Sequence, residues 1–369
     1  MTEFIPGLEL GRRFYQEAVQ PILHKHFPDL KYSAALIGSG SEVLGFDTER
    51  STDHHWGPRV MLFLQRQDLA ALAPDLHRVM AEELPFEVAG YATNFGPADE
   101  IGVRLMRPAH VGPIAHRVEM DTLGNFLNGY MGVAEPEAMS SVDWLITPQQ
   151  KLRTLTHGSV FHDGLGELER IRAELNWYPE DIWRALLAAQ WGRIGQEEAF
   201  PGRCAEVGDE LGSRIITTRL VCDLMRLFFL MERTYAPYSK WFGTGFSRLS
   251  CASTVAPALS AALDANSWLV REEGLVAAYR IAAEMHNELE LTGPLPTEPR
   301  QFFGRPFRVI RGGEFASALA KDLEDNLLSL ASRVGGVDQW VDSTDVLSHS
   351  DDCRRTSPMY ERQNAASYG

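Results

Sequence analysis

The stretch that decides the fold runs from Leu36 to Leu64 and reads LIGSGSEVLGFDTERSTDHHWGPRVMLFL. It begins in an apolar run that breaks into Gly38-Ser39-Gly40-Ser41, and it ends in a second apolar run over residues 60–64. Asp53-His54-His55 closes the polar loop between the two runs. The pattern predicts a strand, a turn of small residues, a loop and a returning strand, with a carboxylate at the start of the second strand.

The turn of small residues suits the binding of an anion. Gly40 and Ser41 place no bulky side chain in front of their backbone N–H groups, which leaves these groups accessible to phosphate oxygens. An acid nearby, Asp53, can hold the Mg²⁺ that accompanies a nucleotide. This combination favours phosphoryl chemistry over acyl or hydride chemistry.

The same residues resemble the signature of nucleotidyltransferases of the polymerase-beta type. That signature has Gly-Ser, often a further glycine a few residues on, and then an Asp-x-Asp or Asp-x-Glu pair at the head of a strand. Here Gly40-Ser41 is followed by Gly45 and then by Asp53-His54-His55, so His55 stands where the family has its second carboxylate. The resemblance implies that Asp53 and His55 are catalytic metal ligands and that Gly40-Ser41 binds the β- and γ-phosphates.

In these enzymes a third carboxylate comes from a later, neighbouring strand. Residues 116–123 alternate apolar and polar side chains, which puts Val118 and Met120 on one face of a strand and Glu119 and Asp121 on the other. Glu119 is the first choice for the third catalytic and metal-binding acid, and Asp121 is the second. A solvated strand face with two acids is an equally good interpretation.

Composition limits the class of protein. A chain of 369 residues predicts two domains, and 44% hydrophobic with 23% charged residues is typical of a globular protein. No apolar run is long enough for a membrane span and the N-terminus has no signal-peptide core, so we expect a cytoplasmic protein. Four widely spaced cysteines indicate reduced thiols. The net charge of -15 argues against broad nucleic-acid binding and favours a small substrate or a single nucleotide as the ligand.

The pattern of the whole chain predicts an α+β fold. We expect a nucleotidyltransferase-like domain with a mixed sheet at residues 1–147, a helical domain covering the nucleotide or substrate at 148–335, and a C-terminal segment at 336–369 that ends in a mobile tail. The charged residues of a long helix at 205–233 are interpreted as solvated ion pairs. The other expected elements of the first domain are helices at residues 7–26 and 68–84 and strands at 86–91, 101–106 and 113–123.

Residues 235–243, YAPYSKWFG, combine aromatic side chains with one lysine directly after the long helix. Such a turn can offer a base-stacking surface, to which Tyr238 contributes, and a cation for phosphate. Lys240 resembles the lysine near the domain junction that often reaches the triphosphate in helical domains attached to nucleotidyltransferases. The alternative is an aromatic cluster that caps a helix, with Lys240 in solvent.

A broader resemblance covers nearly the whole chain up to about Leu347. It is to a bacterial family of uncharacterised proteins, usually described as a domain of unknown function within the nucleotidyltransferase-like superfamily. The segments that carry it are Asp53-His54 followed by Trp56-Gly57-Pro58-Arg59, then Pro148-Gln149-Gln150-Lys151, Gly208-Asp209-Glu210-Leu211-Gly212-Ser213-Arg214, Lys240-Trp241-Phe242-Gly243 and Asp338-Gln339.

Two functions follow. The first is a metal-dependent transfer of a nucleoside monophosphate from an NTP to a small-molecule or protein hydroxyl, with Asp53 bridging the metals and Lys240 steadying the leaving group. The second is a catalytically degenerate nucleotide-binding or regulatory module. Because imidazole is a poor ligand for Mg²⁺, His55 leaves three outcomes open: Mn²⁺, a single Mg²⁺, or binding without turnover. Asp47 and Glu49 are a possible substitute for the missing acid.

Overall fold

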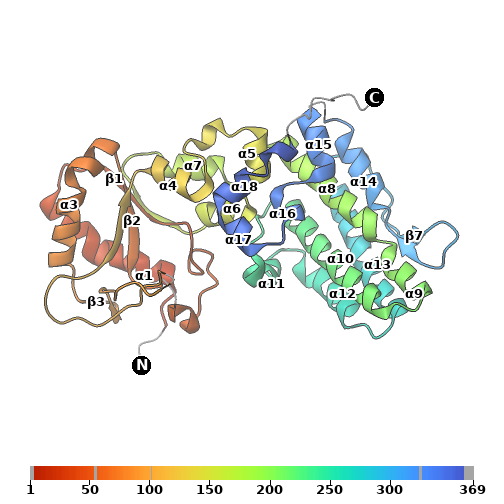
Figure 1. Ribbon diagram of the computed structural model, residues 1–369, viewed down its shortest axis with the longest axis horizontal. Helices are drawn as coiled ribbons and strands as arrows, with labels where there is room; N and C mark the ends of the chain where they lie inside the picture. Colours follow the sequence, from red (N-terminus) through yellow and green to blue (C-terminus); the bar gives the residue numbers. More distant parts are fainter. Residues whose placement is uncertain (1–3, 54–55, 101, 324–325, 361–369) are drawn as a thin grey trace. The chain divides into compact units, whose positions relative to one another are not determined.

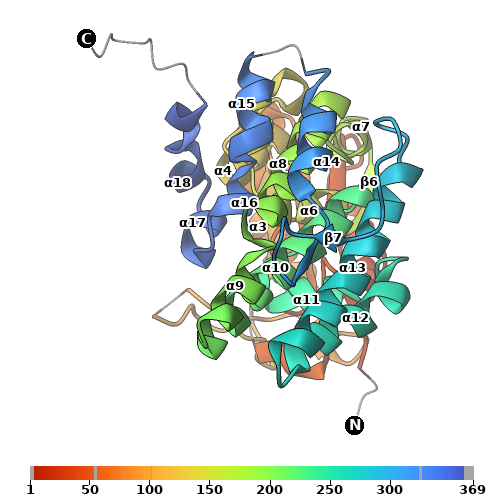
Figure 2. The same ribbon diagram turned by 90° about the vertical axis from the view of Figure 1, so that its right-hand side faces the viewer.

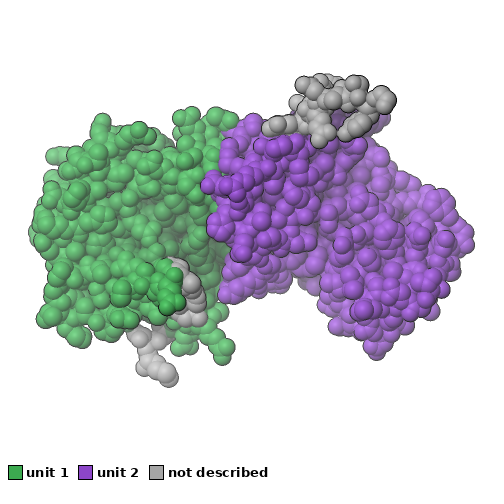
Figure 3. Space-filling model, in the orientation of Figure 1, with its two compact units in different colours: residues 1–138, 151–176 green, residues 139–150, 177–369 purple. Residues whose placement is uncertain are grey.

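The computed structural model of the chain describes residues 4–53, 56–100, 102–323 and 326–360. The fold is α+β, as predicted, with a small mixed sheet in the N-terminal part and helices in the C-terminal part (Figure 1). The chain divides into two compact units (Figure 3). Unit 1 comprises residues 1–138 and 151–176, and unit 2 comprises residues 139–150 and 177–369.

The sheet of unit 1 has four strands in the order β5-β2-β1-β6. Strand β1 (Tyr32–Leu36) is antiparallel to both of its neighbours, β2 (Arg59–Leu64) and β6 (Ser159–Asp163). Strand β5 (Arg117–Asp121) is parallel to β2, with Met61 opposite Glu119. The returning strand predicted from residues 60–64 is therefore confirmed, and it pairs directly with the strand before the glycine-serine turn.

A layer of helices covers one face of this sheet. Helix α1 (Gly7–Phe14), a π-helical turn (Tyr15–Val19) and helix α2 (Gln20–His26) run without a break, and α3 (Arg66–Glu83) follows β2. Val60, Leu62 and Val118 belong to the apolar core beneath these helices. Since side chains alternate along a strand, Arg59, Met61 and Glu119 lie on the opposite face. The two predicted helices of this domain are confirmed.

Strand prediction was less accurate in the next segment. Residues 86–91 form only two short strands, β3 (Glu87–Val88) and β4 (Tyr91–Ala92), and residues 102–106 contain an isolated bridge from Met106 to Phe95 but no strand. Ile101, the first residue of the predicted strand, lies outside the described residues. Glycines and prolines interrupt this segment, so its apolar residues do not alternate along a continuous ladder.

The prediction also missed β6. Residues 159–163 lie within the region expected to be helical, yet β6 pairs with β1 along its length, and helices α6 (Gln149–Thr156) and α7 (Leu168–Glu174) flank it. This pairing places residues 151–176 in unit 1, so the division of the chain differs from the predicted domains 1–147, 148–335 and 336–369. The reason is that strand pairing over more than 120 residues of separation leaves no local signal in the sequence.

Unit 2 is predominantly helical. Helix α8, which is largely buried, packs against α10, α14 and α15, and the views agree on this arrangement (Figure 2). A Cβ added at Gly195 would lie 2.6 Å from the backbone nitrogen of Gly313, so α8 and α14 approach closely only because this residue is glycine. The helices of this unit are α5 (Ser141–Ile146), α8 (Glu180–Glu197), α9 (Phe200–Glu206), α10 (Glu210–Met231), α11 (Phe242–Phe246), α12 (Ala252–Asp264), α13 (Trp268–Glu288), α14 (Gly312–Ala320), α15 (Asn326–Val334), α16 (Val337–Trp340), α17 (Thr344–Ser348) and α18 (Ser350–Arg354).

The C-terminal segment is more ordered than predicted. A mobile tail was expected at the end of residues 336–369, but residues 350–354 form α18 and the Cys353 side chain is buried. The buried Tyr360 hydroxyl donates a hydrogen bond of 2.6 Å to the carbonyl of Gly335. Residues 336–360 are therefore part of unit 2 and not a separate segment, whereas residues 361–369 lie outside the described residues.

Among the helices in the described part of the chain, none combines the length and apolar character needed to cross a lipid bilayer.

The end of β6 depends on Asp163. Its carboxylate accepts hydrogen bonds from the Ser33 hydroxyl (2.6 Å) and from the backbone nitrogens of Gly166 (3.1 Å) and Glu169 (3.0 Å). Burial alone would raise the pKa of this carboxyl, but these hydrogen bonds outweigh it and lower the pKa. Asp163 thus joins β1, β6 and the first turn of α7.

We predict that Asp163→Ala lowers the free energy of unfolding by about 1–2 kcal/mol at neutral pH, because it leaves these donors without an acceptor. Since the pKa is lower in the folded state, the stabilisation is present above the ordinary pKa of an aspartate and is lost as the pH falls through the folded-state pKa. Urea unfolding from about pH 7 down to about pH 3 checks this. The exposed Asp75→Ala is the control; a difference from wild type that does not change with pH would contradict the prediction.

Candidate functional site

The glycine-serine turn leaves the end of β1 and remains accessible to solvent. Ser39 is exposed, whereas Gly40 and Ser41 are half-buried. Gly38 and Gly40 have φ angles of 83° and 150°, which disfavour residues with a side chain. A Cβ at Gly40 would lie 2.6 Å from both Arg59 Nη2 and Glu42 Oε2. Both members of the Arg59–Glu42 ion pair therefore lie directly against the backbone of this turn.

Arg59 ties the turn to the sheet. It is the first residue of β2, and its Nη2 donates hydrogen bonds to the Ser39 carbonyl (2.7 Å) and to Glu42 Oε1 (2.5 Å). Its Nε donates to the same Glu42 oxygen at 2.9 Å. Both side chains are largely buried. A buried ion pair with several hydrogen bonds has a fixed geometry, so the turn has a defined position at the start of β2.

Helix α6 supports the turn from another direction. The Gly38 nitrogen donates to the Thr154 carbonyl at 3.0 Å, and the Tyr130 and Thr154 hydroxyls lie 2.6 Å apart. The Lys151 ammonium donates to the Tyr130 carbonyl at 2.6 Å and lies 4.7 Å from the centroid of its ring. Sequence reasoning quoted Lys151 and Arg59 within motifs but assigned neither of them a role beside the turn.

The two candidates for the third carboxylate have different surroundings. Glu119 lies on the face of β5 that also carries Arg117, and its exposed carboxylate pairs with Arg117 at 2.5 Å. Asp121 accepts hydrogen bonds from the Thr122 nitrogen (2.7 Å) and the Asn125 side chain (3.0 Å) at the start of helix α4 (Leu123–Met131). Asp121 therefore has a local structural role, whereas Glu119 lies closer to the end of the sheet that holds the turn.

The remaining predicted metal ligands are not described. Asp53 ends a 3₁₀ helix (Glu49–Asp53), but its side chain and all of His54 and His55 lie outside the described residues. Asp53, His55 and Glu119 as a metal site thus stay a prediction. Within the described part of the chain, no three His, Cys, Asp or Glu side chains are grouped as a metal site requires. Asp47, the suggested substitute, accepts hydrogen bonds from the Gly7 nitrogen and the Trp56 indole.

The aromatic segment predicted to bind nucleotide belongs to unit 2. Lys240 is exposed, and its ammonium lies 5.0 Å from the centroid of the Trp241 ring. Tyr235 is buried against Trp177 and Tyr178. Tyr238 is half-buried and lines a cavity. The predicted nucleotide-binding residues are therefore divided, with Gly40 and Ser41 in unit 1 and Tyr238 and Lys240 in unit 2.

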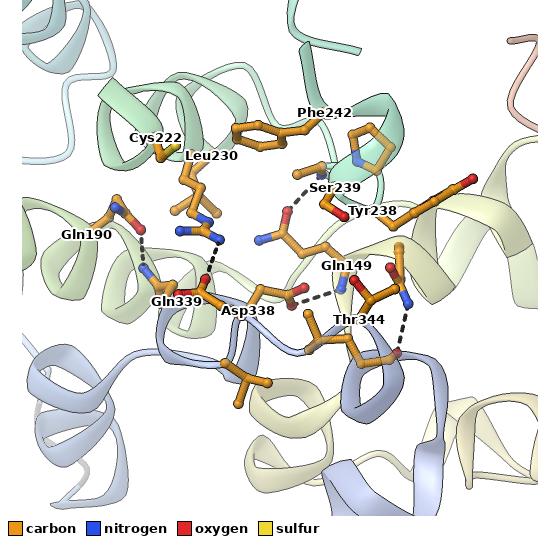
Figure 4. Close-up of a pocket in the computed structure, with 17 residues that line it drawn as sticks. Gln149, Gln190, Cys222, Leu230, Tyr238, Ser239, Phe242, Asp338, Gln339 and Thr344 are labelled. Carbon is orange, nitrogen blue, oxygen red and sulfur yellow. Dashed lines mark hydrogen bonds and ion pairs between the residues drawn. The ribbon is translucent and has the colours of Figure 1, made fainter. Parts of the chain in front are cut away.

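The cavity lies wholly within unit 2 and has a volume of about 400 Å³ (Figure 4). Three of the segments that carry the broader resemblance contribute to its lining, through Gln149 and Gln150, through Phe242, and through Asp338 and Gln339. In Figure 4, Phe242, Ser239 and Tyr238 lie on one side of the space and Asp338, Gln339 and Thr344 on the other. Sites of this size and mixed polarity are typical of small-molecule binding.

A fully hydrogen-bonded network forms one end of this cavity. The Gln339 amide nitrogen donates to Gln190 Oε1 at 2.9 Å and to the Leu186 carbonyl at 3.0 Å. The Gln190 amide nitrogen donates to Asp223 Oδ1 at 2.9 Å, and Arg193 donates to the same oxygen at 3.1 Å. Asp223 is only 2% exposed, so the interpretation of the charges on this helix as solvated pairs is wrong for this residue.

Asp338 differs from the other acids of the cavity. One of its carboxylate oxygens accepts the backbone N–H of Gln149 at 2.9 Å, and no ion pair to Asp338 is found among the described residues. Burial raises the pKa of this carboxyl to about 6, although the hydrogen bond from Gln149 and the charge of Arg226 act in the opposite direction. A carboxyl that is destabilised in its charged form and lies in a cavity is a candidate for ligand binding.

Sequence reasoning named Asp338-Gln339 only as part of a motif. The only feature of the sequence that marked these two residues was a short polar segment with a tryptophan in an otherwise helical region. It did not indicate that Asp338 meets Gln149, because these residues are 189 positions apart.

Comparison with known proteins agrees with part of the predicted resemblance. Residues 144–242 match the model of a family described as a domain of unknown function (DUF4037), which confirms the resemblance to such a family over this segment. The segment includes Gln149, Arg226, Tyr238 and Phe242 of the cavity. A crystal structure of a nucleotidyltransferase-like protein from Exiguobacterium sibiricum 255-15 is similar over 73% of this chain and 75% of that chain, with a TM-score of 0.32 and 9% sequence identity. No curated protein matches the chain significantly.

We predict that the free energy of unfolding of Asp338→Asn, minus that of the wild type, is larger at about pH 8 than at about pH 4. A folded-state pKa near 6 means that the wild-type folded protein loses stability as the pH rises from about 4 to about 6. The uncharged amide removes that loss, which we expect to be about 1–2 kcal/mol after allowing for partial exposure of the carboxylate.

Thermal and urea unfolding of both proteins across this pH range measure the effect. The other ionisable groups near Asp338 are Arg226, Asp342, Tyr178 and Tyr360, and burial raises the pKa of both tyrosines, so neither tyrosine titrates between pH 4 and 8. Asp342→Asn, at a side chain that is 90% exposed, is the matched control. Parallel pH profiles for Asp338→Asn and wild type would refute the assignment.

Proposed function

We propose that the chain is a metal-dependent nucleotidyltransferase that moves a nucleoside monophosphate from an NTP to the hydroxyl group of a small molecule or protein. The observation that carries the proposal is the arrangement at one end of the sheet in unit 1. The glycine-serine turn follows the carboxyl end of β1, and the amino ends of β2 and β5 lie at the same end of the sheet because β1 is antiparallel to β2 and β2 is parallel to β5.

Three chemical components of a phosphoryl-transfer site gather at this end. Backbone groups at Gly40 and Ser41 suit the β- and γ-phosphates, and the Arg59–Glu42 ion pair beside them fixes the position of the turn. Glu119 supplies a carboxylate on the same face of the sheet as Arg59. Positioning and charge neutralisation are the main requirements of this chemistry; these residues supply the positioning, and a bound divalent cation would supply the charge neutralisation.

The reaction proceeds by attack of an acceptor hydroxyl oxygen on the α-phosphorus of the NTP. A bond forms between these two atoms while the bond from the α-phosphorus to the bridging oxygen of the β-phosphate breaks, and pyrophosphate leaves with that electron pair. The hydroxyl proton passes either to a carboxylate, for which Glu119 is the candidate, or to solvent. The glycine-serine turn holds the departing phosphates.

The donor atoms suit a hard divalent cation. Carboxylate oxygens from Asp53 and Glu119 are ligands that Mg²⁺ and Mn²⁺ prefer, and His55 would favour Mn²⁺ if it contributes its imidazole. Such a cation would neutralise charge that builds up on the phosphate oxygens. Asp53, His55 and Glu119 are the residues proposed to hold it. Glu119 would then exchange part of its interaction with Arg117 for the cation.

One observation favours the alternative of a nucleotide-binding or regulatory module. Glu119 forms its 2.5 Å ion pair with Arg117 on its own strand, and His55 replaces the second acid of the motif. A site with these properties could bind a nucleotide at the turn and leave it intact.

We predict that the protein releases pyrophosphate from at least one NTP in the presence of Mg²⁺ or Mn²⁺ and a hydroxyl acceptor. Asp53→Ala should lower this rate at least about a hundredfold, since a bound metal contributes several kcal/mol to transition-state stabilisation. His55→Asp should preserve or raise the rate, because it restores an oxygen ligand. Coupled pyrophosphate assays with each NTP and each metal measure these effects.

Asp75→Ala is the control, because Asp75 is an exposed acid of unit 1 on helix α3 and has no proposed role in the site. Full activity of Asp53→Ala would eliminate the proposed metal site. Stabilisation by nucleotide without turnover, with any acceptor tried, would establish the module instead of the enzyme.

A further inference from the structure

The cavity of unit 2 has a charge imbalance that is independent of the proposed transferase. Its charged lining residues are Asp338, Asp342 and Arg226, so it carries one net negative charge. Arg226 is already engaged, because its guanidinium lies 3.4 Å from Asp342 and 3.9 Å from Asp223. Asp338 has no such partner among the described residues. The carboxylate that remains uncompensated is therefore the one that faces the enclosed space.

A partly buried carboxylate without a cation is energetically unfavourable. The surroundings of Asp338 offer it only uncharged donors, the backbone N–H groups of Gln149 and of Asp338 itself, and the Gln339 side chain next to it is committed to Gln190, Leu186 and Gly336. A ligand that brings a positively charged hydrogen-bond donor would satisfy the remaining oxygen. One positive charge on the ligand is sufficient, because Asp342, the other acid of the lining, already pairs with Arg226.

The opposite side of the cavity is apolar and aromatic. Phe242 and Tyr238 present rings to the space (Figure 4), and Pro237 and Leu230 add aliphatic surface to the lining. Aromatic faces attract cations and also pack against a hydrocarbon skeleton. The space thus combines one negatively charged wall with one apolar wall, and its volume of about 400 Å³ is sufficient for a small organic molecule.

We propose that this cavity is a binding site for a small organic monocation, whose ammonium group is held by the Asp338 carboxylate while its carbon skeleton lies against Tyr238 and Phe242. Anionic ligands are disfavoured by the net charge of the lining. Neutral ligands would leave Asp338 without a charged partner. The site requires no metal and no nucleotide.

The test uses the full-length protein and pairs of probes that differ only in charge. Calorimetric titration at about pH 8 compares butylamine, cyclohexylamine and 2-phenylethylamine with the alcohols of the same skeletons, under conditions in which the amines are protonated and Asp338 is ionised. We expect at least one amine to bind at least tenfold more tightly than its alcohol. The aromatic probe should be the tightest of the three amines.

Asp338→Asn should reduce the affinity of that amine at least tenfold and leave the affinity of the alcohol unchanged, whereas Asp342→Asn should change the amine affinity less than about threefold. The comparison of amine with alcohol in the wild-type protein needs no variant, so it remains informative if Asp338→Asn is unstable. Equal binding of every amine and its alcohol, failure of all three amines to bind, or full amine affinity in a folded Asp338→Asn protein would overturn the proposal. None of these outcomes depends on pyrophosphate release.

Discussion

The buried ion pair between Arg59 and Glu42 is the interaction on which the candidate active end of unit 1 depends. Arg59 begins β2, and the same guanidinium that pairs with Glu42 also donates a hydrogen bond to the Ser39 carbonyl. Removing either partner would leave an uncompensated charge in a largely buried position. The pair therefore fixes the glycine-serine turn against the first residue of a strand, which is where backbone donors for phosphate must be positioned.

Strand β1 supplies the second constraint. It is antiparallel to β2 on one side and to β6 on the other, and β2 is parallel to β5. This order brings the turn, Arg59 and Glu119 to one end of the sheet, while the alternate side chains Val60, Leu62 and Val118 enter the core under the helices. The chemistry and the packing thus use opposite faces of the same strands, so a shift of one residue in register would destroy both.

The sequence allowed the local parts of this arrangement to be predicted. The apolar runs on either side of the glycine-serine turn predicted β1 and β2, and helical periodicity predicted residues 7–26 and 66–83 within a few positions. Strand β6 was not predicted, because five residues between helical segments carry little periodicity and their partner lies more than 120 positions away. The cavity of unit 2 was not predicted for the same reason, since Gln149, Arg226, Tyr238 and Asp338 meet only after folding. Asp53 and Glu119 remain predictions from motif and strand alternation.

The central claim is that Asp53 and Glu119 hold a divalent cation beside the glycine-serine turn. A crystal structure of the protein soaked with Mn²⁺ and a non-hydrolysable NTP analogue tests it most directly, because manganese is located by its anomalous scattering. We expect a manganese peak at roughly 2.0–2.3 Å from carboxylate oxygens of both Asp53 and Glu119, with the β- and γ-phosphates against Gly40 and Ser41. A structure in which Glu119 stays paired with Arg117 and the manganese and phosphates bind elsewhere would contradict it.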